Sequence, residues 1–256
     1  MAYSIPPYIV AAAVDSRELR FKWDDWRASQ DFEYQPDEVL ERLAKISLRA
    51  KITAAIGMYE WIMWRFRLVS NDPTPLQVAE AAWCANVRRD YMVYDEFDRD
   101  DWMGPVRGPL WCAMTWLMPM MFLGDDNLDE WESGISYLAR LANHVLPNPA
   151  VFREWLDGSI NRLLELYPAV AEDPFGNLFG ENEEARRGPL VPREVLATDS
   201  EFRPDMTRSL IDRFLRTVDY RSNPFLNSPE AMLSNGFDGA PYAFNTHDDR
   251  KRRTED

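Results

Sequence analysis

The carboxylates that are best spaced for chemistry lie in residues 124–130, where Asp125, Asp126 and Asp129 form a DDxxD pattern. Carboxylates one helical turn apart can share a hard cation such as Mg²⁺, and such cations bind a diphosphate leaving group. A structural explanation competes with this one. The same acids stand at the start of a predicted helix, where the macrodipole and the capping positions favour them. We favour the structural explanation and keep a metal site as the alternative.

The DDxxD string follows an apolar helix rich in aromatic residues and methionine. It resembles the magnesium-diphosphate motif of terpene synthases, which are all-α enzymes with an aromatic cavity. That resemblance implies Mg²⁺ at the three carboxylates. The second motif of that family has an imperfect counterpart at Asp157, Asn161 and Glu165, where Gly158 replaces a carboxylate and Asn161 a hydroxyl. The resemblance covers these two short strings.

A second acidic stretch spans residues 90–101, with aromatic side chains interleaved. We expect it at the end of a helix, where the dipole disfavours negative charge, so these acids need another explanation. One explanation is a basic partner protein, because carboxylates beside aromatic anchors suit such an interface. The alternative is that Arg88, Arg89 and Arg99 neutralise several acids and that solvent covers the rest. The binding interpretation predicts these partner-contacting residues: Asp90, Tyr94, Asp95, Glu96, Asp98, Asp101 and Trp102.

Glu60 is the single charge in the most apolar helical stretch of the chain, residues 52–64. A buried carboxylate of this kind is a candidate acid with a raised pKa. We favour an ion pair with an arginine of a neighbouring helix, with Arg88 or Arg89 as the candidate partner.

Other familiar site chemistry is missing from the sequence. The chain has only two Cys and two His, and it contains no HExxH, CxxC, GxGxxG, GxxxxGK[ST] or GxSxG pattern. We therefore predict no cofactor and no catalytic residues, and we leave open whether the protein is an enzyme, with a non-enzyme favoured.

The elements that must position these residues are predicted to be helices. Apolar periodicity and capping signals predict one long central helix from Pro36 to about residue 70, in which Gly57 allows a close neighbour. A capping box at Thr74 starts a second predicted helix, which extends to about residue 97. Further helices are expected at 110–123, 127–145, 149–166, 204–221 and 228–235, with one short helix after Pro192. No segment alternates with a period of two for long enough to be a strand.

The chain should therefore be an all-α domain of about seven or eight helices around the long central one. Residues 1–35 form an aromatic N-terminal arm, 36–245 the helical domain and 246–256 a disordered charged tail. Residues 171–203 are expected to be mostly a long loop, and residues 237–244 an aromatic strap over the core.

Composition limits the function classes. Hydrophobic residues make up 46% of the 256 residues and aromatic residues 13%, which indicates a folded chain. The net charge of −14 disfavours binding to nucleic acid or to anionic lipid and favours a basic partner. The longest uncharged stretch, residues 108–124, is shorter than the roughly 20 apolar residues that cross a bilayer. Residues 1–14 lack the features of a signal peptide, so we expect a cytoplasmic protein.

An acidic helical domain of this size, dense in aromatic residues and poor in catalytic motifs, resembles the immunity proteins that bacteria make against their own polymorphic or type VI secreted toxins. The resemblance lies in overall character and transfers no residues. It implies an inhibitor that neutralises a cognate basic toxin through an acidic, aromatic surface. The alternatives are the magnesium-dependent prenyl-diphosphate enzyme and a structural or adaptor module, and the sequence leaves the oligomeric state open.

Overall fold

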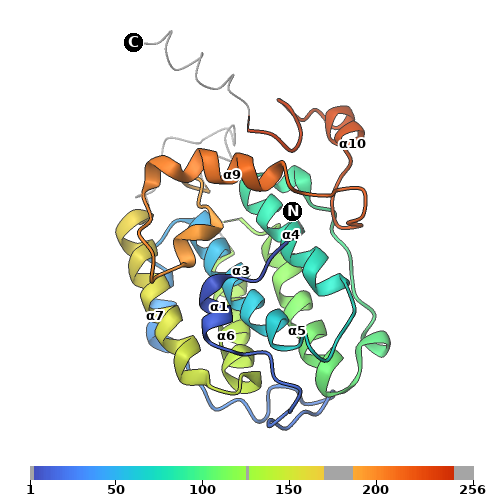
Figure 1. Ribbon diagram of the computed structural model, residues 1–256, viewed down its shortest axis with the longest axis vertical. Helices are drawn as coiled ribbons and strands as arrows, with labels where there is room; N and C mark the ends of the chain where they lie inside the picture. Colours follow the sequence, from blue (N-terminus) through green and yellow to red (C-terminus); the bar gives the residue numbers. More distant parts are fainter. Residues whose placement is uncertain (1–2, 125–126, 170–186, 245–256) are drawn as a thin grey trace.

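A computed structural model shows that the protein is all-α (Figure 1). The structure describes residues 3–124, 127–169 and 187–244, which include no β-strand, and this confirms the predicted fold class. The α-helices in this part of the chain are α1 (Pro7–Ala11), α2 (Asp37–Leu43), α3 (Leu48–Arg65), α4 (Thr74–Val87), α5 (Gly104–Met120), α6 (Leu128–Val145), α7 (Pro149–Leu166), α9 (Thr207–Leu215) and α10 (Pro229–Ser234). Four short 3-10 helices join them: η1 (Arg89–Tyr91), η2 (Arg99–Trp102), η3 (Arg193–Leu196) and η4 (Pro204–Met206).

Helix α3 runs through the middle of the molecule and packs against α4, α5, α6 and α7 (Figure 1). Every residue from 48 to 63 is buried. The apolar surface on all sides predicts this for residues 52–63, whereas the burial of Arg49 and Lys51 was not predicted. Gly57 allows a close approach, because a Cβ atom there would lie 2.7 Å from Leu196 and 2.9 Å from Trp155. The prediction of a central helix with a close neighbour at Gly57 is therefore confirmed.

The central helix does not begin at residue 36, and the prediction of one continuous helix over 36–70 is wrong. The chain leaves the helical path between α2 and α3, where Ile46 forms an isolated bridge with Pro168. Ser47 then caps α3, since its hydroxyl accepts a hydrogen bond from the amide of Ala50. A serine side chain competes with the helix for backbone hydrogen bonds, so it favours a new start over a helix interior.

Helix α4 ends at Val87 instead of extending to about residue 97. Arg88 is extended, and the guanidinium of Arg49 binds the last carbonyls of α4, at Asn86 and Val87. A cation from another helix thus satisfies the free helix end. At the start of α4, the prediction that Thr74 caps the helix in a capping box is wrong. The carboxylate of Asp72 instead accepts a hydrogen bond from the backbone N–H of Thr74.

Helix α5 begins at Gly104, earlier than the predicted residue 110. The Asp25 carboxylate of the N-terminal arm accepts a hydrogen bond from the Gly104 amide, 3.0 Å from either oxygen. This cap comes from a residue far away in the sequence, and the local signal for the helix start is Pro105 in the first turn.

The N-terminal arm packs on the helices, as predicted. Tyr8 of α1 stacks on Trp155 of α7, and Ile9 is completely buried. Arg65, at the end of α3, is 1% exposed and donates to the carbonyls of Ser16 and Glu18. The arm is therefore fixed to the core at several points along its length.

The C-terminal strap also packs as predicted. The Tyr242 ring lies against Tyr91 and Tyr220, and its hydroxyl donates to the carbonyl of Asn227 at 2.6 Å. The predicted charged tail and much of the predicted loop over 171–203 lie outside the described residues. In the part of the chain that is described, no helix has the length and apolar character that crossing a membrane requires.

Candidate functional site

The acidic stretch is a connector between α4 and α5, not the end of a helix. This corrects the expectation that its acids stand against a helix dipole, because α4 ends before the first of them. Five of the carboxylates are exposed, and none of the five takes part in an ion pair with a described residue; they are Asp95, Glu96, Asp98, Asp100 and Asp101. We call these five residues the acidic row.

Asp90 differs from the acidic row, because it pairs with Arg88 at 2.8 Å. The other two arginines do not neutralise the row. Arg89 donates to the carbonyl of Leu123, and Arg99 lies over the rings of Trp26 and Trp111. The alternative that neighbouring arginines neutralise the acids therefore holds for Asp90 alone.

Backbone contacts hold the acidic row in place. Met92 forms a bridge with Leu226, and the amide of Val93 donates to the carbonyl of Phe225 at 2.9 Å. The carboxylate of Asp98 caps η2 by accepting from the amide of Asp100. The charges are thus presented from an ordered segment.

The two predicted aromatic anchors have different environments. Tyr94 is 49% exposed and packs its ring edge to face with Phe122. Trp102 is only 6% exposed and lies under the guanidinium of Arg107. The Trp102 ring belongs to the core and offers a partner little surface, and its contact with a partner stays a prediction.

Trp26 is an exposed aromatic residue outside the predicted set. It is 73% exposed, and the Arg99 guanidinium of η2 lies 4.2 Å from the centre of its ring. Two aspartates precede Trp26, but two aspartates also precede the buried Trp102, so the local sequence gives no signal for the exposure of Trp26. The structure thus brings the arm and the acidic row together.

Glu60 lies at the centre of a buried polar network that joins α3 to the N-terminal arm, α4 and η3. Its carboxylate pairs with Arg193 at 2.7 Å, which corrects the expectation of Arg88 or Arg89. The hydroxyls of Tyr3 and Tyr8 and the indole N–H of Trp83 also donate to it. Arg193 follows Pro192 in a region with little helical pattern, so no local signal indicates that it reaches the core.

This network has the features of a structural element. Glu60 is 0% exposed, so its carboxylate has no contact with solvent or with a dissolved substrate. Burial raises the pKa of Tyr3 and of Tyr8, and the neighbouring Glu60 charge raises both further. Burial lowers the pKa of Arg193, but Glu60, Tyr3 and Tyr8 together raise it by more, so the pKa is raised overall. Arg193 therefore stays charged and the two phenols stay protonated at neutral pH.

The described residues contain no cluster of His, Cys, Asp and Glu that would hold a metal ion. In the first predicted motif, Asp129 is exposed, whereas Asp125 and Asp126 lie outside the described part. In the second motif, Asp157 and Asn161 both bind the guanidinium of Arg42. An arginine thus occupies the position where a metal would be expected for that motif.

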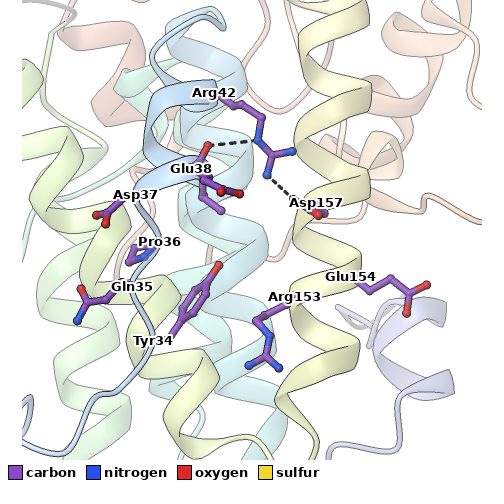
Figure 2. Close-up of a pocket in the computed structure, with 10 residues that line it drawn as sticks. Tyr34, Gln35, Pro36, Asp37, Glu38, Arg42, Arg153, Glu154 and Asp157 are labelled. Carbon is purple, nitrogen blue, oxygen red and sulfur yellow. Dashed lines mark hydrogen bonds and ion pairs between the residues drawn. The ribbon is translucent and has the colours of Figure 1, made fainter.

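A pocket of about 460 Å³ lies beside this arginine, between α2 and α7 (Figure 2). Tyr34 and Glu38 line it from the α2 side, and Arg153 and Asp157 line it from α7. In Figure 2, Asp37 and Glu154 point away from the Tyr34 ring, and Asp157 points to the guanidinium of Arg42. The pocket combines charges of both signs and offers no paired acid and base.

Comparisons with models of protein families, with curated proteins and with solved structures found no match for this chain. Its function must therefore be inferred from its own residues.

Proposed function

We propose that the protein is an immunity protein, a stoichiometric inhibitor that binds and neutralises a basic toxin through its acidic row. The observation that carries this proposal is the row itself: exposed carboxylates that make no ion pair with a described residue, held on an ordered connector beside the exposed ring of Tyr94. Carboxylates that no described arginine or lysine neutralises can bind a cationic partner.

The physical role of the row is to replace an anion. A toxin that acts on an anionic substrate has a cationic cleft, and carboxylates at fixed positions fit such a cleft. The net charge of −14 attracts a basic protein over a longer range and speeds the encounter. The aromatic rings then provide the contact area that interfaces use for affinity.

The test is capture followed by rescue. The chain, expressed with an affinity tag in the cell that produces it, should retain a basic protein in a 1:1 complex that weakens as salt is added. Expression of that basic protein in an unrelated bacterium should stop growth, and co-expression of the chain should restore it. A captured protein that is harmless, or whose toxicity continues in the presence of the chain, would contradict the proposal.

A further inference from the structure

We propose that Trp26 is the anchor of this interface and stacks on an arginine side chain of the basic partner, so that the N-terminal arm forms half of the binding surface. This inference rests on the proposed function, because it takes the partner to be a basic protein. It adds the second segment of the surface and the side chain that this segment recognises.

The arm is held firmly at this point. The Asp25 carboxylate accepts from the Gly104 amide of α5 and, at 2.7 Å, from the indole N–H of Trp23. Trp23 also presses against Gly108 of α5, where a Cβ atom would lie 2.3 Å from the indole nitrogen. The Asp24 carboxylate accepts from the Trp26 amide at 2.8 Å. The residues on which Trp26 depends are thus fixed to the first turns of α5.

The ring of Trp26 is exposed even though its backbone is fixed. Its 73% exposure is the largest among the exposed large hydrophobic side chains of the described residues. A rigid, exposed tryptophan loses little conformational freedom on binding, and tryptophan is enriched among residues that carry binding energy.

The ring already binds one guanidinium. Arg99 lies over Trp26 at 4.2 Å and over Trp111 at 5.6 Å, and in the described structure it makes no ion pair with the acids beside it. Arg99 lies over the Trp26 ring, yet the residue is still 73% exposed, so much of the ring is open to solvent. A second guanidinium could stack on this open part of the ring.

The surroundings favour a positively charged side chain. Asp98 and Asp100 flank Arg99 in sequence, so the stack connects Trp26 to the acidic row. A guanidinium is planar, stacks on indole, and forms paired hydrogen bonds with carboxylates, whereas a lysine ammonium does so less well. The same carboxylates would repel a nucleic-acid backbone. The surface therefore fits an arginine-bearing face of a protein.

The test uses two labelled peptides, nona-arginine and nona-lysine, and measures their dissociation constants by fluorescence anisotropy at low salt. The unchanged chain should bind nona-arginine several-fold more tightly than nona-lysine. Trp26→Ala should weaken binding of nona-arginine about fivefold and remove the preference, because the stacking contact is lost. Trp26→Phe, which keeps an aromatic face, should restore part of the preference.

Two control variants separate stacking from charge. Met206→Ala removes another exposed apolar side chain, on η4, and should change neither constant. Asp101→Lys should weaken the binding of both peptides to the same extent, because it changes the charge of the surface and leaves the Trp26 ring in place. Equal binding of the two peptides by the unchanged chain, or a preference for arginine that survives Trp26→Ala, would overturn the inference.

These outcomes are distinct from failure of the proposed function. If the captured toxin is neutralised equally well by the Trp26→Ala variant, the immunity function stands and the anchor is elsewhere. If the peptides show the arginine preference but capture and rescue fail, the anchor stands and the immunity function does not.

Discussion

At the scale of single residues, the most consequential feature is the ion pair between Glu60 and Arg193. Two opposite charges in a low-dielectric interior lose hydration, and their mutual attraction must compensate for that loss. The tyrosine hydroxyls and the indole N–H supply further hydrogen bonds to the carboxylate. Glu60 is thus satisfied only while the arm and η3 are both in place.

Removal of one member of the Glu60–Arg193 ion pair should lower the free energy of unfolding more than removal of both members. Arg193→Met leaves the Glu60 charge buried without its cation, so the free energy of unfolding should fall by about 3 to 5 kcal/mol. The double variant Glu60→Met/Arg193→Met should recover much of that loss. Urea unfolding measures both values, and Arg203→Met, which breaks an exposed pair with Asp205, should cost less than about 1 kcal/mol. Equal losses in the single and double variants would show that an unpaired buried charge is not the cause.

Glu80 provides a pH-dependent test at the same scale. Burial raises the pKa of its carboxyl, although the hydrogen bond from Asn223 lowers it in part. A raised pKa means that the charged form is less stable in the folded than in the unfolded chain, so stability is lost as the pH rises through the folded pKa.

Glu80→Gln should therefore stabilise the protein at pH 7, by up to about 1 kcal/mol as for other partly buried sites. The gain should vanish below the ordinary carboxyl pKa of 4.5, where Glu80 is protonated in both states. Urea unfolding of both proteins at neutral and acidic pH measures the difference, and the same gain at both pH values would argue against a charge effect.

At the scale of secondary-structure elements, helix boundaries depend on caps from distant parts of the chain. Asp25 caps α5, and Arg49 closes α4. Apolar periodicity in the sequence predicts where helices exist and that α3 is central. It does not predict boundaries that depend on such long-range caps, and for this reason the predicted ends of α4 and α5 were wrong. The start of α3 is different, because Ser47 at the N-cap is a local signal. The prediction of one continuous helix over 36–70 did not use this signal.

The capping role of Ser47 predicts a modest loss for one substitution. Ser47→Ala leaves the amide of Ala50 without its acceptor, so the free energy of unfolding should drop by about 1 kcal/mol. Thermal unfolding followed by circular dichroism measures the change. Ser29→Ala, at an exposed position in the arm, is the control, and an equal shift in both variants would show that the cap contributes nothing specific.

Close packing around α3 predicts opposite outcomes for two helical glycines. Gly57→Ala puts a methyl group into Leu196 and Trp155 and should lower the unfolding free energy by about 1 to 3 kcal/mol. In Gly158→Ala of α7, the new methyl group would contact only Thr198, at 3.3 Å, and alanine has the higher helix propensity. The free energy of unfolding should therefore change by no more than about 0.5 kcal/mol. Denaturant unfolding compares the two, and a neutral Gly57→Ala would contradict the described packing.

At the scale of the whole molecule, the excess of acids over bases is the property that the proposed function uses. The sequence predicts that the acids at 95–101 are solvated, because charge runs are mostly on the surface, and all five lie exposed. It does not predict that Trp102 is buried while Trp26 is exposed. Which of two tryptophans faces solvent depends on how the arm packs, and the local sequence does not encode that packing.

The exposed charge of the acidic row predicts a change in association rate. Glu96→Lys/Asp101→Lys should slow binding of the captured basic partner by about three- to tenfold at low ionic strength, with a smaller effect in added salt. The control Glu165→Lys/Glu201→Lys makes the same charge change at exposed positions outside the acidic row. Stopped-flow measurements compare the rates, and an equal slowing in both would show that total charge, not the row, governs the encounter.

The Glu60 network also has a consequence for the order in which the protein matures. Tyr3 and Tyr8 leave the ribosome early, whereas Arg193 emerges only after most of the helices have been synthesised. Until then the carboxylate lacks its cation, so we expect the burial of Glu60 to be completed only after Arg193 has been synthesised. A bulky fusion attached ahead of Tyr3 would hinder this final step, which makes the carboxyl end the safer place for a tag.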